Sequence, residues 1–288
     1  MNTLPASTSD KSVRHRYGHD ALRSKIELIR NLYRESSIRL NPTSQLYELL
    51  ESARKLVDEW ASGDSKTTNM SLLLKSLHVE RISNAIQVLS NDDLKEKYLR
   101  DLLQGTLNFF EREPSHAKSI LWELEVCAKI RKSIPDTHLT EPDVVVSLQG
   151  KKIAIPCKKI FSERGVSKVL SNAVSQFENL FDFGIVAINI DDLIPADVLL
   201  KARTFEELHD KLHLANMTFF ANHERHFIKY LSKSRIIAVI ASTALVADVQ
   251  DESPKFNNAH QWAIWTTPEL LPTHAKAVEA FREKVMGG

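Results

Sequence analysis

A short segment near the middle of the chain carries the residues with the clearest chemical potential. Asp143 stands at the start of one run of β-branched residues, and Lys158 stands near the end of the next run. Side chains alternate along a strand, so Pro156 and Lys158 share one face while Cys157 lies on the other. A carboxylate beside a lysine suits metal-assisted cleavage of a phosphodiester bond. The carboxylate binds Mg²⁺, and the lysine orients water or stabilises developing charge.

Local chemistry predicts that these two runs form a β-hairpin. Residues 144–148 and 153–157 are apolar and largely β-branched, and Gln149-Gly150 joins them. Gly150 supplies the positive φ that a tight turn requires. The hairpin places Lys158 where it could meet Asp143.

Helical and strand patterns flank the hairpin. Residues 119–130 show helical apolar spacing, with Ser119 as a possible N-cap and Glu123 near the start. Residues 166–180 predict a second helix, and residues 184–190 predict a strand buried on both faces. We expect the hairpin and the last strand to share one sheet, with the helix crossing over between parallel neighbours.

This order of elements, with these residues, resembles the PD-(D/E)XK nuclease superfamily over roughly residues 116–195. The resemblance implies an α/β fold with a restriction-endonuclease-like mixed sheet flanked by helices. It also implies Mg²⁺ as cofactor and DNA as the expected substrate, with RNA not excluded. The matching positions are Glu123, which follows Trp122; Asp143, which follows Pro142; Lys158 in the terminal triplet; and Gln176 on the following helix.

The resemblance assigns roles to these residues. Asp143 would bind the metal, Glu123 would be an outer or alternative ligand, and Lys158 would orient water or stabilise charge. Many members carry a glutamate where this chain has Pro156. Proline binds no metal and removes a backbone donor from the sheet.

Two explanations of Pro156 remain open at this stage. The missing carboxylate could have moved to a neighbouring element, with Glu178, Glu163 or Glu141 serving in its place. Alternatively the site is inactive, and the fold serves as a module that binds nucleic acid or protein. Glu178 is our candidate for an additional metal ligand.

Each part of the motif also has a purely structural explanation. Pro-Asp is a common start of a turn, and the chain has a second copy at Pro135-Asp136. Lys158 and Lys159 could be a solvated strand end, and Glu123 could simply stabilise a helix start. An unrelated α/β protein could therefore mimic the motif.

Composition indicates an ordinary globular protein. The chain has 288 residues, of which 43% are hydrophobic and 26% charged, and its formal net charge is +1. No apolar run reaches the length of about 18 residues that a membrane span requires, and the start of the chain is polar. We expect a cytoplasmic protein with no membrane partner. Cys127 and Cys157 fall on predicted core faces and are expected to be small buried hydrophobes.

The N-terminal third has a different character from the rest. After a polar tail at 1–19, residues 20–115 form an all-helical region that precedes a nuclease-like α/β domain at 116–288. The region offers no motif with recognisable chemistry, and we expect that it could mediate a homodimer or bind a protein partner. Its predicted helices are 20–39, 44–60, 72–89 and 92–110.

Overall fold

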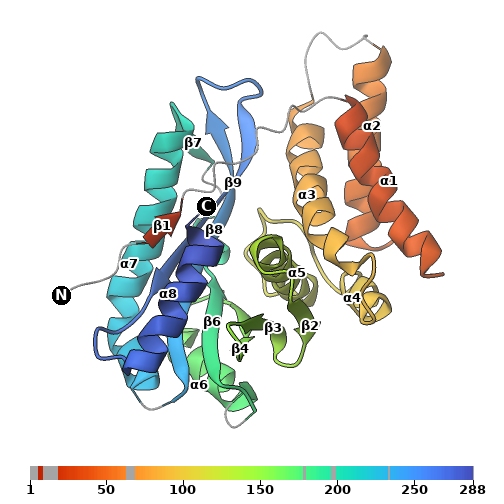
Figure 1. Ribbon diagram of the computed structural model, residues 1–288. Coiled ribbons are helices and arrows are strands. Elements are labelled where there is room, and N and C mark those ends of the chain that lie inside the picture. Colours follow the sequence, from red (N-terminus) through yellow and green to blue (C-terminus); the bar gives the residue numbers. More distant parts are fainter. Residues whose placement is uncertain are drawn as a thin grey trace.

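The chain folds as a mixed α/β protein with a helical N-terminal region (Figure 1). A helical start followed by a mixed sheet flanked by helices was the sequence expectation, and it is confirmed. None of the described helices is both long and apolar enough to cross a membrane. The computed structural model describes residues 6–8, 19–62, 69–177, 180–195, 199–232 and 234–287.

The helical region packs through apolar stripes at helical spacing. Leu22, Ile26 and Ile29 of the first helix are almost fully buried, as their i, i+4, i+7 positions predict. The helices are α1 (His19–Glu35), α2 (Gln45–Ser62), α3 (Met70–Ile86) and α4 (Lys95–Asp101), with a 3₁₀ turn at Gln87–Leu89.

The fourth predicted helix was too long. Helix α4 ends at Asp101, and the chain turns at Gly105, whose φ is +113°. The polar N-terminal tail also contains a strand, β1 (Ala6–Thr8), which pairs antiparallel with the strand at Phe256–Trp265. The rest of that tail, apart from His19, lies outside the described residues.

The described strands form one mixed sheet of nine. Its main path runs β1-β9-β8-β6-β4-β3-β2, while β5 pairs with β6 and β7 pairs with β8. The strands after β1 are β2 (Thr137–Thr140), β3 (Asp143–Leu148), β4 (Lys151–Ile155), β5 (Cys157–Lys159), β6 (Phe183–Asn189), β7 (Leu200–Ala202), β8 (Ile236–Val249) and β9 (Phe256–Trp265).

Helices cover both faces of this sheet (Figure 1). One face packs against α5 (His116–Ser133) and α8 (Pro272–Met286), and the other against α6 (Val166–Phe177) and α7 (Phe205–Leu231). Helices α3 and α4 pack against α5, and α3 also contacts β9. The helical region is therefore a further layer that shares its apolar core with α5.

The predicted hairpin and its turn at Gln149-Gly150 are confirmed. Val144 pairs with Ile155, and Gln149 and Gly150 both have positive φ, 51° and 72°, as a type I′ turn requires. The expected sheet is confirmed as well, because β4 and β5 both run parallel to β6 with α6 between them. Strand β2 was not foreseen.

Pro156 divides one strand into two. It is buried between β4 and β5, and its carbonyl still accepts a hydrogen bond from the Ala187 amide at 3.0 Å. Proline has no amide hydrogen to donate, and the pairing with β6 that ends at Ala154 resumes at Cys157. The alternation of side chains continues across it, so Cys157 still faces α5.

Buried charges join the helical region to the sheet. Arg81 of α3 contacts Glu125 of α5 at 2.5 and 2.9 Å and Asp191, just after β6, at 2.9 Å. Lys159 of β5 lies 2.6 Å from Asp192, and both side chains are at most 3% exposed. These ion pairs fix α3, α5, β5 and the end of β6 relative to one another.

We predict that Arg81→Met destabilises the protein by about 3–5 kcal/mol, because it leaves Glu125 and Asp191 without their buried counter-charge. Urea unfolding measures the change. Arg54→Met is the matched control, since Arg54 makes a comparable double ion pair with Glu51 and Asp58 at an exposed position. We expect the control to change stability little. Equal losses in both variants would contradict the role given to the buried network.

Candidate functional site

Helix α5 presents Glu123 to the start of the hairpin. Its N-cap is Ser115, four residues before the predicted Ser119, and the Ser115 hydroxyl accepts from the Lys118 amide. The indole of Trp122 is buried and donates to the Ala187 carbonyl at 3.1 Å, which ties α5 to β6. This hydrogen bond fixes the rotation of α5 about its axis. It thereby fixes the direction in which Glu123, the next residue, leaves the helix.

Asp143 begins β3 in an unusual backbone conformation. Its φ is +94°, a region that side chains other than glycine rarely adopt. Its Oδ2 accepts from the Cys157 amide at 2.7 Å and from the Lys158 ammonium at 3.1 Å. The predicted meeting of Asp143 with Lys158 therefore occurs in the structure, and the Cys157 amide helps to hold the carboxylate.

Glu123 completes a cluster of three predicted residues. Its pKa is raised to about 8, chiefly by burial and next by the nearby negative charge of Asp143, while the Tyr98 hydrogen bond and the charge of Lys158 lower it. The phenol of Tyr98 donates to Glu123 Oε2 at 3.0 Å. Asp143 and Lys158 are also mostly buried, with 15% and 19% of their side chains exposed. Two carboxyl groups and one lysine thus lie close together beside the start of β3 and strand β5.

Asp182, which lies just before β6 and contacts the start of β4, offers a direct comparison. Asp182 accepts from the Lys152 amide at 3.0 Å and from the Lys151 ammonium at 3.2 Å, the same two kinds of donor that Asp143 has. Those bonds lower the pKa of Asp182. The pKa of Asp143 is instead raised, because burial outweighs the charge of Lys158 and the Cys157 bond. The two aspartates thus accept the same kinds of hydrogen bond, but burial makes the pKa of Asp143 higher and exposure leaves that of Asp182 low.

Each carboxylate of the cluster keeps one oxygen available. Among the described residues, neither Asp143 Oδ1 nor Glu123 Oε1 accepts a hydrogen bond, and neither is fully enclosed. Two carboxylates with open oxygens fit Mg²⁺, which takes one or two protein carboxylates and completes its shell with water and phosphate. Within the described part of the chain, no three His, Cys, Asp or Glu side chains are grouped to hold a metal ion.

The alternative carboxylates have different surroundings. Glu141 is exposed, and its charge contributes to the raised pKa of Asp143. Glu125 belongs to the Arg81 ion pairs, and Glu163 lies 4.0 Å from His223 on α7. Glu178 lies outside the described residues. Of the alternatives that the structure describes, Glu141 is therefore the one whose charge acts on Asp143.

Gln176 does not join the cluster. It is exposed in the last turn of α6, and α6 runs from the end of β5 back to the start of β6. The first residue of β6, Phe183, pairs with Ile153 of β4. A helix of this length rises about 18 Å. Gln176 therefore lies toward the opposite end of the strand from Lys158.

Tyr98 is the site residue that sequence reasoning missed. It is 3% exposed, lies in α4 of the helical region, and is 25 positions before its partner Glu123. Burial and the charge of Glu123 raise its pKa, so the phenol remains a donor. No local spacing connects a helix in one region with a carboxylate in the next. Only the packing of α4 on α5 reveals the contact.

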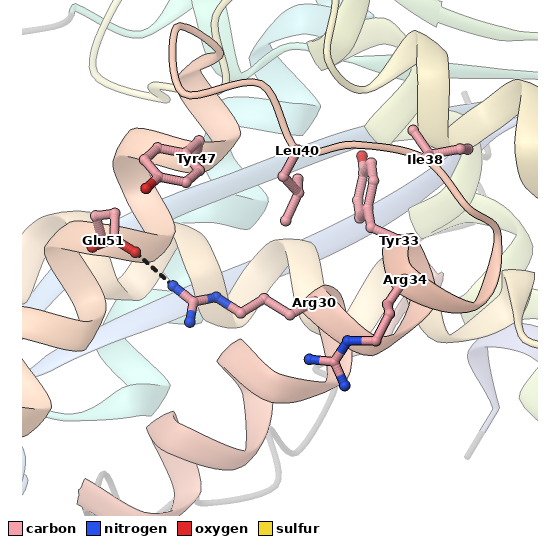
Figure 2. Close-up of a pocket in the computed structure, with 7 residues that line it drawn as sticks. All are labelled: Arg30, Tyr33, Arg34, Ile38, Leu40, Tyr47 and Glu51. Atoms are coloured by element: carbon pink, nitrogen blue, oxygen red, sulfur yellow. Dashed lines mark hydrogen bonds and ion pairs between the residues drawn. The ribbon is translucent and has the colours of Figure 1, made fainter.

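A separate pocket of about 400 Å³ lies in the helical region (Figure 2). Arg30 and Glu51 bridge it at 2.6 Å, and Glu51 also accepts from Arg54. The pocket is formed by α1, α2 and the segment between them, so it is distinct from the Asp143 cluster. Its lining residues are Arg30, Tyr33, Arg34, Ile38, Leu40, Tyr47 and Glu51.

The two cysteines are buried as expected. Cys127 and Cys157 are free thiols in the core beside α5, and burial raises the pKa of each.

Comparisons of the chain with protein-family models, with curated proteins and with solved structures find no match.

We predict that Glu123→Gln stabilises the protein at alkaline pH relative to wild type. The pKa of Glu123 rises from an ordinary 4.5 to about 8 on folding, so the folded chain binds more protons between these values. Wild-type stability therefore falls as pH rises through this window, by roughly 2–4 kcal/mol from this residue. Glutamine keeps the acceptor for Tyr98 and removes the titration.

Thermal melts between about pH 5 and pH 9 measure this difference. Glu48→Gln is the control, because Glu48 is exposed and the bond from Lys75 lowers its pKa. We expect the melting curves of wild type and Glu123→Gln to diverge with rising pH, and no such gain in the control. Parallel pH dependence in wild type and Glu123→Gln would contradict a carboxyl group that is neutral at pH 7.

Proposed function

We propose that this protein has a restriction-endonuclease-like fold and is a metal-dependent nuclease that hydrolyses phosphodiester bonds in DNA. The order α5, β3–β4 hairpin, β5, α6 and β6 supports the fold assignment, since it follows the order of the PD-(D/E)XK pattern. The positions of Asp143, Lys158 and Glu123 within that order support the activity.

The observation that carries the proposal is that two largely buried carboxyl groups, those of Glu123 and Asp143, lie close enough to affect each other electrostatically. Glu123 and Asp143 both have raised pKa values, chiefly because of burial, and the charge of Asp143 also raises the pKa of Glu123. The buried carboxylates of Glu125 and Asp191, by contrast, both pair with the positive charge of Arg81. Groups with strongly perturbed pKa values beside a lysine are typical of functional sites. A cation bound there would allow Glu123 to lose its proton beside Asp143.

The residues of the cluster suggest a division of work in hydrolysis. Asp143 and Glu123 would hold Mg²⁺, which would supply Lewis-acid polarisation of the scissile phosphate. Lys158 would orient the attacking water or stabilise charge on the phosphate oxygens. The water oxygen bonds to phosphorus as the bond to the leaving ribose oxygen breaks, and one strand end retains the phosphate while the other becomes a hydroxyl.

Pro156 limits the rate of such an enzyme. It occupies the position where a third carboxylate would complete the pattern, and its buried side chain offers no ligand. Mg²⁺ affinity should therefore be low, and cleavage slow. Glu141 could contribute a further oxygen, since its charge already reaches Asp143.

A second candidate function is a nuclease-fold module that binds DNA without cleaving it. The favouring observation is the contact of 3.1 Å between the Lys158 ammonium and Asp143. That ammonium neutralises the carboxylate in the absence of any ion. In such a module Lys158 would serve stability, and removal of divalent ions would leave DNA binding unchanged.

We predict slow Mg²⁺-dependent nicking of supercoiled duplex DNA by the wild-type protein, and its loss in Asp143→Asn and Lys158→Met. Asparagine tolerates positive φ better than alanine, so the backbone of residue 143 is preserved. The matched controls are Asp182→Asn and Lys151→Met, which break the equivalent exposed pair at the other end of β4. Parallel reactions on single-stranded RNA distinguish the two substrates.

Nicking that persists in Asp143→Asn would refute the proposed site. Tight, metal-independent DNA binding with no nicking at any Mg²⁺ concentration would instead establish the binding module.

We predict that Pro156→Glu raises Mg²⁺-dependent nicking at least about tenfold over wild type, because it adds a carboxylate to a metal site that has two. A thermal melt must accompany the assay, since replacing proline also changes backbone entropy and residue 156 is buried. Pro156→Gln is the control for that backbone effect. A folded Pro156→Glu protein no more active than Pro156→Gln would contradict the account of Pro156.

A further inference from the structure

We propose that Tyr98 is a positioning residue for Glu123, so that the helical region completes the metal site of the α/β domain. This inference rests on the proposed function, because it concerns how one ligand of that site is held. It makes the helical region part of the catalytic machinery, where the sequence indicated only a surface for partners.

The contact between the two side chains is specific. The Tyr98 phenol donates to Glu123 Oε2 at 3.0 Å, and it is the one hydrogen bond that the Glu123 carboxyl group receives from the described residues. Glutamate has three rotatable side-chain bonds, so a single fixed donor decides where the carboxylate points. With Oε2 held by Tyr98, Oε1 is the oxygen left for a ligand.

Helix α4 is held firmly enough to serve this purpose. The phenol of Tyr33 in α1 donates to the Leu99 carbonyl at 2.8 Å. On the other side, Arg131 of α5 donates to the Val88 carbonyl at 3.0 Å and to Asp92 at 3.4 Å. The segment before α4 and the helix itself are thus fastened to both α1 and α5. The position of Tyr98 is therefore set by the packing of α4 against α1 and α5.

The arrangement resembles the outer shell of a metal site. Hydrogen-bonded partners of ligating side chains orient those ligands, and their removal typically costs about 10- to 100-fold in metal affinity or activity. In this protein, a layer that contributes no ligand of its own would set the affinity of the site through Tyr98.

Mn²⁺ binding, followed by electron paramagnetic resonance, tests the inference in the full-length protein. We expect Tyr98→Phe to weaken Mn²⁺ binding about tenfold. Tyr33→Phe is the matched control, because it removes a buried tyrosine hydroxyl bonded to the same helix without touching Glu123. Both variants should lose a similar, small amount of thermal stability. Only Tyr98→Phe should lose Mn²⁺ affinity.

Two other variants separate this inference from the proposed function. If Asp143→Asn loses Mn²⁺ binding while Tyr98→Phe matches wild type, the metal site stands and the positioning role is overturned. Equal weakening in Tyr33→Phe and Tyr98→Phe would also overturn it, because the loss would then come from general loosening of α4. If wild-type protein binds no Mn²⁺ and Pro156→Glu binds none either, the proposed metal site itself fails.

Discussion

Carboxylates buried inside a protein must be compensated by nearby charge, and this constraint organises the centre of the molecule. Arg81 compensates Glu125 and Asp191, and Lys159 compensates Asp192. Glu125 is two residues from Glu123 on α5, and Lys159 is adjacent to Lys158 on β5. Because the ion pairs hold Glu125 of α5 and Lys159 of β5 to the segment after β6, they also position the nearby Glu123 and Lys158. The candidate site depends on these ion pairs although it contains none of them.

Much of the segment from α5 to β6 could be predicted from sequence because its signals are local. The hairpin follows from two apolar runs and Gly150, and α6 and β6 follow from periodicity. The meeting of Asp143 and Lys158 follows from strand alternation. Each of these inferences needs only residues close together in the chain, and each element appears within a few residues of its expected bounds.

What could not be predicted depends on contacts between distant elements. Tyr98 meets Glu123 because α4 packs on α5, and nothing in the local pattern of residues 92–110 indicates that contact or the end of the helix at Asp101. The N-cap of α5 was misplaced because both Ser115 and Ser119 precede apolar helical residues. Gln176 seemed to match a motif, but the direction of α6 carries it away from Lys158. Similarity of order thus predicted elements better than it predicted membership of the site.

The charge of the cluster explains why a cation and a phosphate group would favour each other's binding. Glu123, with a pKa of about 8, is mostly protonated at neutral pH, and the charges beside it are those of the Lys158–Asp143 ion pair. The cluster is then close to neutral. A divalent cation that displaces the Glu123 proton leaves an excess positive charge, and a phosphodiester carries the negative charge that balances it.

A third carboxylate, at position 156, would balance this excess positive charge even when no phosphodiester is bound. A Pro156→Glu variant should therefore bind metal before substrate arrives, whereas the wild-type chain should bind metal best together with phosphate. The low affinity expected for free Mg²⁺ and the slow cleavage expected for DNA then have the same electrostatic origin.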